Sequence, residues 1–229
     1  MALHFLTGAG SGIGAALAAR LHARGDDLIL LARSDTRAQQ LRQRFPSAQT
    51  VVAELAAPGD LAAALARHDL PSGLDSLLHV AGVVDLGPVS ELTVGAWSSQ
   101  LDVNLVAPAE LTRLLLPALR AAKGQVVFVN SGAGLRAAPE WAAYAASKHG
   151  LKALADSLRA EEASNGVRVS SVYPGRTATA MQERVHEQEG RDYDPAAFID
   201  ADSVVTSILT VLDLPRDAQI PDLTIRPGV

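Results

Sequence analysis

The stretch Thr7-Gly8-Ala9-Gly10-Ser11-Gly12-Ile13-Gly14 decides the fold of this chain. It follows the apolar run Leu3–Leu6 and leads into Ile13–Ala23, which is rich in alanine and leucine. The pattern is typical of a strand, a glycine-rich turn and a helix. In such a turn the backbone approaches a pyrophosphate closely, and the helix N-terminus supplies free N–H groups and a partial positive charge. A plain tight turn is the alternative interpretation.

We expect three of the glycines in this turn to have separate structural roles. We expect Gly8 to open the turn and Gly12 to leave the space in which a side chain would block the phosphates. Gly14 would let the helix pack closely on the strand. The expected phosphate-binding segment consists of Gly8, Gly10, Ser11, Gly12, Ile13 and Gly14.

Apolar runs that suit buried strands alternate with helical patterns along the rest of the chain. The expected strands are Leu3–Leu6, Leu28–Leu31, Thr50–Ala53, Ser76–Val80, Gln125–Asn130, Arg168–Tyr173 and Thr224–Ile225. The expected helices are Ile13–Ala23, Ala38–Phe45, Gly59–His68, Val94–Leu119, Trp141–Ser164 and Asp202–Leu212. Continuous apolar strands are buried on both faces, and their alternation with helices implies right-handed crossovers. The sequence therefore predicts a doubly wound α/β fold with a mostly parallel sheet, the Rossmann fold.

Length and composition restrict the possibilities further. The chain fits one α/β domain, residues 1–229, in which the less regular stretch Arg176–Ala201 is a candidate substrate lid. The net charge of −5 gives no general attraction to nucleic acid or to anionic membranes. The absence of cysteine excludes disulfides and thiolate chemistry and is compatible with a cytoplasmic location. We expect Met1–Thr7 to form a strand rather than a targeting segment, and we expect no membrane span and no metal site.

The end of the second expected strand indicates which dinucleotide is bound. In dinucleotide folds an acid here bonds the ribose 2′-hydroxyl of NAD, whereas an arginine accommodates the 2′-phosphate of NADP. Ala32 leaves no acid at this position, and Asp35 lies where the next helix would begin. Arg33 suits the phosphate and Ser34 could add a hydroxyl donor, so we expect NADP(H) to be preferred, with NAD(H) still possible. A solvated surface arginine is the alternative interpretation of Arg33.

The spacing Thr-Gly-x-x-x-Gly-Ile-Gly in Thr7–Gly14 resembles the cofactor turn of the short-chain dehydrogenase/reductase family. The resemblance covers residues 3 to about 211, and its motifs follow the order found in the family. It implies that Glu54 and Leu55 lie beside the adenine. The family has an aspartate and a hydrophobic residue there, so Glu54 is a mild departure.

The fourth expected strand departs further from the family pattern. Where the family usually has Asn-Asn-Ala-Gly, this chain has His79-Val80-Ala81-Gly82. Ala81 and Gly82 fit the close approach to the cofactor's ribose that the resemblance implies. Val80 cannot make the polar contact of an asparagine side chain. We interpret His79 as a hydrogen-bonded structural histidine rather than a catalytic base.

The reacting groups are expected after the fifth strand. Ser131 stands 13 residues before Tyr144, and Tyr144-Ala145-Ala146-Ser147-Lys148 matches the family's Tyr-x-x-x-Lys. Positions four apart share one face of a helix. Tyrosine has an ordinary pKa of about 10, and a nearby ammonium favours phenolate and lowers that pKa. We therefore expect Tyr144 to be the acid/base, Lys148 to tune it, and Ser131 to bond the substrate oxygen where negative charge develops.

Two further sets of residues follow from the resemblance. Asn104 matches the family's asparagine in the long helix before the fifth strand, where it helps a water chain relay protons to the lysine. A capping or kink residue is the alternative interpretation. The segment Tyr173–Thr179 resembles the family's Pro-Gly-x-x-x-Thr, which holds the nicotinamide carboxamide. The residues expected there are Pro174, Gly175, Thr177 and Thr179.

These residues predict an NADP(H)-dependent oxidoreductase that moves hydride between nicotinamide and a small carbonyl or alcohol substrate. The alternatives are an NAD-dependent alcohol dehydrogenase and a non-catalytic dinucleotide-sensing regulator, and the retained Tyr144 and Lys148 disfavour the regulator. Arg136 and Arg176 could bind an acidic substrate group, although solvated arginine is the simpler interpretation. The expected pocket lining is Val83, Leu86, Leu135, Pro139, Trp141 and Met181.

Two long helical stretches bear on assembly. Val94–Leu119 and Trp141–Ser164 carry more apolar surface than one contact with the sheet can cover. In the family that this chain resembles, the matching helices pair with their symmetry mates. We therefore expect a homodimer or homotetramer, with a monomer as the alternative.

Overall fold

A computed structural model describes residues 1–228 of this protein. Within those residues seven strands form one sheet in the order β3-β2-β1-β4-β5-β6-β7, and all neighbouring strands are parallel. The strands are β1 Leu3–Thr7, β2 Asp27–Ala32, β3 Gln49–Val52, β4 Ser76–His79, β5 Gln125–Val129, β6 Arg168–Pro174 and β7 Asp222–Ile225. The predicted fold class is confirmed, and each expected strand lies within two residues of an observed one.

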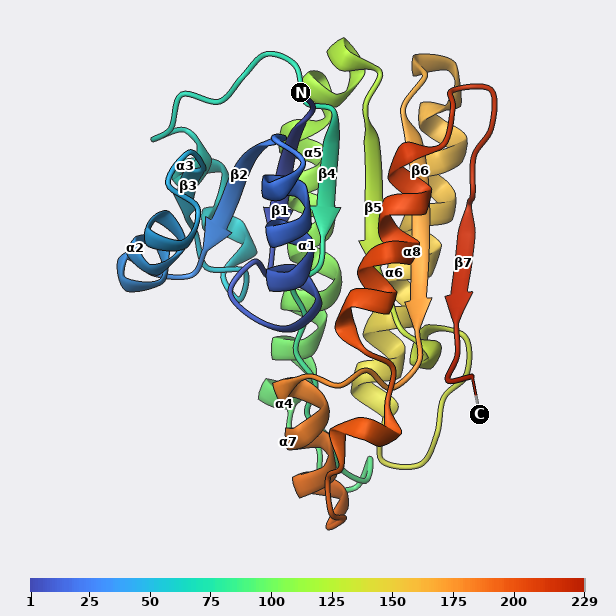
Figure 1. Cartoon of the computed structure of the whole chain (residues 1–229). Coiled ribbons are helices and arrows are strands. Elements are labelled where there is room, and N and C mark those ends of the chain that lie inside the picture. Colours follow the sequence, from blue (N-terminus) through green and yellow to red (C-terminus); the bar gives the residue numbers. More distant parts are fainter. Residues whose placement is uncertain (229) are drawn as a thin grey trace.

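Helices cover both faces of the sheet. They are α1 Gly12–Ala23, α2 Asp35–Arg44, α3 Leu61–Leu65, α4 Val94–Leu101, α5 Ala107–Ala122, α6 Ala142–Glu162, α7 Ala180–Glu189 and α8 Ala201–Asp213. One buried core joins the sheet to α3, α5 and α6, and the other joins it to α1, α2 and α8. In Figure 1, α1 and α8 lie in front of the sheet, with α5 and α6 behind it.

The chain order places the carboxyl ends of β1 and β4 side by side. The chain runs from β1 outwards to β3 and then returns to β4 on the other side of β1. In open parallel sheets, ligands bind in the crevice outside the carboxyl ends of the strands at such a reversal. Helices α4 and α7 lie beyond this same edge of the sheet (Figure 1). The candidate residues at the ends of β1, β4, β5 and β6 therefore meet at one edge.

Two stretches differ from the continuous helices that the sequence predicts. The expected helix Val94–Leu119 is divided into α4 and α5 by a π-helical turn, Asp102–Val106. Its apolar pattern runs through this turn, so the interruption leaves no mark in the periodicity. The stretch Arg176–Ala201 contains helix α7 and a short 3-10 turn, Pro195–Ala197. As expected, Asp35 begins a helix, α2.

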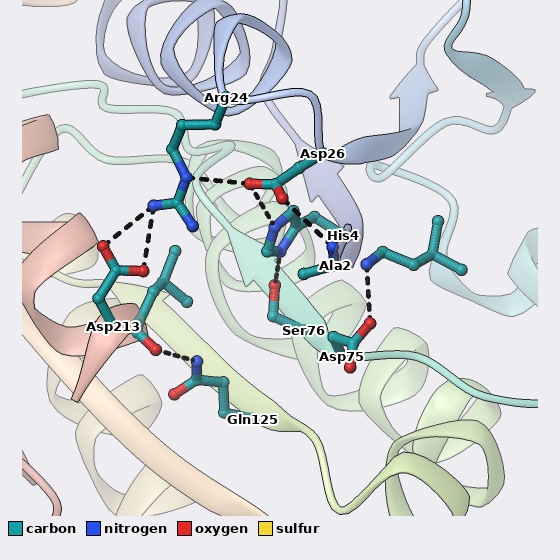
Figure 2. Close-up of polar contacts among 10 residues, drawn as sticks. Ala2, His4, Arg24, Asp26, Asp75, Ser76, Gln125 and Asp213 are labelled. Atoms are coloured by element: carbon teal, nitrogen blue, oxygen red, sulfur yellow. Dashed lines mark hydrogen bonds and ion pairs between the residues drawn. The ribbon is translucent and has the colours of Figure 1, made fainter. Parts of the chain in front are cut away.

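Polar side chains hold the amino ends of the central strands together (Figure 2). His4 bonds through Nδ1 to Ser76 Oγ at 2.6 Å and lies 3.4 Å from Asp26 through Nε2. Arg24 lies 3.1 Å from the same carboxylate and 3.0 Å from that of Asp213 on α8. Although serine, histidine and aspartate form a line here, Ser76 has no exposed surface. We interpret the group as structural because no substrate can reach the hydroxyl.

Helices of residues 1–228 show no candidate for a membrane span. None of them combines the length and the apolar character that crossing a bilayer requires.

His79 is a buried structural side chain. Its Nε2 atom bonds to Thr112 Oγ1 at 2.9 Å, and its ring stacks on Phe128 with centroids 4.9 Å apart. Burial, reinforced by the positive charge of Lys148, lowers the pKa of His79 to about 3. This geometry agrees with the interpretation of His79 as a hydrogen-bonded core residue.

His79 is expected to make the fold sensitive to acid. Its folded pKa lies below the unfolded value of about 6.5, so its stabilising effect is complete above pH 6.5 and is lost as the pH falls towards 3. Between pH 7 and pH 5 the loss amounts to roughly 2 kcal/mol. Urea unfolding of wild type and His79→Asn at both pH values measures it. The variant should lose less stability on acidification, whereas His68→Asn, at a partly exposed histidine, should behave as wild type. An unchanged pH dependence in His79→Asn would contradict this assignment.

Candidate active site

The glycine turn between β1 and α1 is closely packed against backbone. Gly8 has a φ of +81°, and a Cβ on it would lie 2.8 Å from the amide nitrogen of Ala81. A Cβ on Gly14 would lie 2.2 Å from the Gly8 carbonyl oxygen, which agrees with the expected close packing of helix on strand. Gly12 has a φ of +50°, and a Cβ there would lie 3.0 Å from a methyl carbon of Thr179. The turn therefore excludes side chains at three positions.

The N-terminus of α1 has the properties of an anion site. Ser11 caps the helix with extended backbone, yet its hydroxyl makes no capping hydrogen bond, and the first turn holds no acidic residue. A Cβ added to Gly10 would meet nothing within 4 Å, so this side of the turn is open. Unsatisfied N–H groups and the helix dipole favour negative charge here. The residues present fit the pyrophosphate of a dinucleotide.

Thr7 fixes the position of the segment after β4. Its hydroxyl oxygen accepts from the amides of Val80 and Ala81, both at 3.1 Å. Sequence reasoning missed this role, because a threonine at a strand end carries no local signal. The side chain of Val80 cannot form the hydrogen bond that an asparagine would form at this position. The hydroxyl of Thr7 holds the backbone of Val80 instead.

The residues expected at the adenosine end lie at the carboxyl ends of β2 and β3. Arg33 is exposed, and within residues 1–228 its guanidinium forms no ion pair or hydrogen bond. The Ser34 hydroxyl caps α2 by accepting from the amide of Arg37 at 3.3 Å. Glu54 is exposed and Leu55 is buried. Arg33 is therefore available for an anionic ligand.

The structure brings Ser131, Tyr144 and Lys148 together where β5 meets α6. Lys148 donates from Nζ to the carbonyl of Val129 at 3.1 Å, and Nζ lies 5.9 Å from the centre of the Tyr144 ring. Tyr144 and Lys148 are 7% and 3% exposed. The phenol and the amine thus share one nearly dry site, and the half-buried hydroxyl of Ser131 lies within hydrogen-bond reach of the phenol, as the motif spacing predicts.

Burial shifts both titratable groups towards their neutral forms. It lowers the pKa of Lys148 to about 8. It raises the pKa of Tyr144, and the hydroxyl of Ser131 acts in the opposite direction. These surroundings therefore favour a protonated phenol, and the pKa of Tyr144 falls only where a positive charge stabilises the phenolate.

Asn130 connects the two elements that carry these groups. Its Oδ1 accepts from the amide of Ser131 at 2.9 Å, and its Nδ2 donates to the carbonyl of Lys148 at 3.1 Å. A Cβ on Gly134 would lie 2.4 Å from the same Oδ1. Asn130 is buried and fixes β5 against α6, a positioning part that the sequence pattern did not reveal.

Asn104 lies in the π-helical turn and is also fully engaged. Its side chain accepts from the amide of Val83 at 2.9 Å, and it donates to the carbonyl of Val83 at 2.8 Å and to Ser147 Oγ at 3.0 Å. A Cβ on Gly82 would lie 3.2 Å from Asn104 Oδ1 and 3.7 Å from Lys148 Nζ. Asn104 therefore holds the segment after β4 close to the ammonium of Lys148.

The segment after β6 lies across the same edge of the sheet. Gly175, which follows Pro174, donates its amide to the carbonyl of Ile225 at 2.8 Å. The Thr177 hydroxyl donates to the carbonyl of Gly175 at 3.0 Å, and the Thr179 hydroxyl caps α7. The methyl group of Thr179 faces Gly12, so this segment contacts the glycine turn directly.

Two side-chain contacts hold α7 over the site. Arg176 forms a two-pronged ion pair with Glu189, and its Cζ lies 5.7 Å from the centre of the Trp141 ring, which in turn meets Tyr144 edge-on. Hydrogen bonds from Arg176 lower the pKa of Glu189. The pair removes Arg176 from the expected binders of an acidic substrate group.

The second contact comes from the end of α7. Gln188 donates from Nε2 to the Asp85 carboxylate at 2.9 Å and accepts from the amide of Leu86 at 3.1 Å. Gln100 on α4 holds Asp85 in place through its backbone. The far end of α7 is thus attached to the segment after β4.

Comparisons with known proteins agree with this geometry. A family model described as short chain dehydrogenase matches residues 3–190. An uncharacterized oxidoreductase of Staphylococcus epidermidis is 28% identical over 97% of this chain and 95% of its own length. Among solved structures, 4-hydroxyisoleucine dehydrogenase complexed with NADH is similar with a TM-score of 0.81 and 26% identity, covering 98% of this chain and 96% of its own. A short-chain dehydrogenase from Sphingobium yanoikuyae in complex with NADPH is similar with a TM-score of 0.82 and 26% identity. The match covers 100% of this chain and 89% of that structure's chain.

The ion pair of Arg176 with Glu189 is expected to limit the opening of α7. In Glu189→Gln we expect the amides of residues 180–189 to exchange with solvent roughly tenfold faster, because a charge-assisted hydrogen bond to a partly exposed arginine is lost. Glu187→Gln removes an exposed carboxylate from the same helix turn and should leave exchange unchanged. Hydrogen–deuterium exchange measures both variants. Equal protection in Glu189→Gln and wild type would show that the ion pair does not hold the helix.

Proposed function

The chain belongs to the short-chain dehydrogenase family, and we propose that it is an NADP(H)-dependent oxidoreductase acting on a small carbonyl or alcohol substrate. The observation that carries the proposal is that the buried Tyr144 and Lys148 lie together with the half-buried Ser131, near the glycine turn. Relatives solved with NADH and NADPH support a nicotinamide cofactor. When bound, that cofactor supplies or accepts the hydride.

Tyr144 supplies the proton in this proposal. In the reducing direction the substrate oxygen gains negative charge, and the Tyr144 hydroxyl gives its proton to that oxygen. Burial raises the pKa of Tyr144, which keeps the phenol protonated at neutral pH and ready to donate. The Ser131 hydroxyl donates a hydrogen bond to the same oxygen.

Lys148 has its main effect in the opposite direction. Oxidation of an alcohol requires Tyr144 to accept a proton, and lowering a phenol pKa from about 10 to about 7 needs roughly 4 kcal/mol. Lys148, with a pKa near 8, is mostly charged at neutral pH and its cation favours phenolate. We propose that Asn104 holds Val83 and the neighbouring backbone so that a water can relay protons to Lys148.

We propose Arg33 as the residue that selects the cofactor. A planar guanidinium suits a two-pronged contact with the 2′-phosphate, and Arg33 has no competing partner within residues 1–228. Ala32 places no carboxylate there to bind a free 2′-hydroxyl. An NAD-dependent enzyme is the second candidate, which the NADH complex of a relative favours.

We further propose that residues 176–201 act as the lid over the substrate. A parallel bridge between Thr177 and Ile199 closes the base of this segment. The rings of His186, Tyr193 and Phe198 pack on one another and give the segment a small core of its own. Such a segment can move as one piece: the ion pair of Arg176 with Glu189 lies within it, and Gln188 attaches its helix to the segment after β4.

We propose a homodimer or homotetramer as the working form, with its location in the cytoplasm. The apolar side chains of Val94, on α4, and Val106, directly before α5, are 83% and 42% exposed, which suits a contact with another copy. The chain contains no cysteine that a reducing compartment would need to protect.

Tyr144→Phe tests the reaction. The change removes one hydroxyl, so the helix and cofactor site should persist while proton transfer is lost. General acid/base catalysis typically contributes about 100- to 10,000-fold, and we expect at least a 100-fold fall in kcat with nearly unchanged cofactor affinity. Steady-state turnover of a carbonyl panel and fluorescence titration with NADPH measure the two quantities. Turnover within a few-fold of wild type would end the proposed mechanism.

Arg33→Ala tests the cofactor preference. A hydrogen bond to a charged group contributes roughly 1.5–3 kcal/mol, so wild type should favour NADPH over NADH by about tenfold or more in kcat/KM. Arg33→Ala should lose most of this preference, and Ala32→Asp should reverse it, since a carboxylate repels the phosphate. Arg67→Ala, at an exposed arginine outside the site, is the matched control. Equal kcat/KM for both cofactors in wild type would exclude Arg33 as the selecting residue.

A further inference from the structure

An arginine from the far end of the chain lies beside Ser131. The turn Gly132–Gly134 follows Ser131 directly, and Arg226 follows β7. The Nη1 atom of Arg226 lies 3.0 Å from the point that a Cβ on Gly132 would occupy, and Cζ lies 3.8 Å from it. Successive Cα atoms are about 3.8 Å apart, so this nitrogen lies within about 8 Å of the Ser131 Cα.

Backbone contacts hold Arg226 in this position. The amide of Gly175 donates to the carbonyl of Ile225 at 2.8 Å and so keeps the end of β7 beside the segment that leaves β6. From there the side chain of Arg226 reaches past the end of β6 to the turn that follows β5. Gly132 has no side chain, and Nη1 occupies the space that one would need. In Figure 1 the connection from β5 to α6 and the end of β7 lie together at the lower right.

The charge of Arg226 is available to a ligand. Its side chain is exposed, and no acidic side chain in residues 1–228 forms an ion pair with it. Arg136 belongs to the same turn, since its amide donates to the carbonyl of Gly132 at 3.1 Å, and it likewise has no acidic partner among those residues. Arg176, by contrast, is bound by Glu189. Within residues 1–228, Arg226 is therefore an unpaired guanidinium next to the turn that carries the reacting hydroxyl, in a chain whose net charge is −5.

We propose that Arg226 binds a carboxylate of the substrate, so that the enzyme interconverts small oxo acids and the corresponding hydroxy acids. The inference rests on the proposed function, because Ser131 and Tyr144 must act on the other end of the same molecule. A planar guanidinium pairs with a carboxylate through two parallel hydrogen bonds. The short distance between Arg226 and Ser131 suits a substrate in which a few carbons separate the carboxylate from the carbonyl.

Matched pairs of substrates test the carboxylate site. We would compare 4-oxopentanoate with its methyl ester at saturating reduced cofactor. Wild type should favour the acid by roughly tenfold or more in kcat/KM. Arg226→Gln should lose this preference through a higher KM for the acid, with the ester unaffected. Arg67→Gln changes an exposed arginine away from the site and should retain the wild-type preference.

A binding measurement separates this inference from the reaction. Saturation-transfer NMR on protein loaded with oxidised cofactor should detect succinate, but not uncharged succinamide, on wild type and Arg67→Gln, and should lose succinate on Arg226→Gln. Equal kcat/KM for acid and ester, no succinate binding to wild type, or undiminished binding to Arg226→Gln would each overturn the carboxylate site. If the ester is turned over as well as the acid and Tyr144→Phe abolishes both, the proposed function stands and the carboxylate site falls. If neither is turned over yet succinate binding requires Arg226, the anion site stands and the proposed reaction falls.

Discussion

The close approach of backbone to backbone at the glycine turn is the constraint on which the rest of this structure depends. The place of a Gly14 side chain is occupied by the Gly8 carbonyl, and that of a Gly8 side chain by the backbone of Ala81. Without these approaches α1 could not start directly at the end of β1, and β4 could not end against the turn. The reversal of strand order at β1 then places a helix N-terminus and the end of β4 in one crevice.

Two asparagine side chains connect these strand ends to the helix that holds the reacting groups. Asn104 joins the segment after β4 to α6, and Asn130 joins the end of β5 to the same helix at Lys148. Both are buried and have their donors and acceptors satisfied, which is the condition under which buried polar groups fix one geometry. Tyr144 and Lys148 therefore owe their positions to contacts with the ends of β4 and β5, and not to the helix alone.

The sequence predicted the parts of the site that local pattern encodes. Each strand was visible as an apolar run. Ser131, Tyr144 and Lys148 were visible through their spacing, because residues at a fixed spacing along one helix or turn lie at a fixed distance and on a known face. Thr7, Asn130 and Arg226 were missed, since each acts on backbone or space supplied by a distant segment. The division of the expected helix Val94–Leu119 at Asp102–Val106 was missed for another reason: apolar residues continue on both sides of the π-helical turn, and no glycine or proline marks its start.

The side chain of Asn104 pairs with the backbone of Val83 through two hydrogen bonds, much as the backbone of a neighbouring strand would. One side-chain amide accepts from the N–H of Val83 and donates to its C=O. The backbone beyond the end of β4 is thereby fixed relative to a helix, and its position depends on the number of residues between the start of α4 and Asn104. Each residue of an α-helix advances by about 100° around its axis, so deleting one residue upstream would rotate Asn104 away from Val83. This geometry therefore restricts the length of the helix upstream of Asn104 more tightly than its composition.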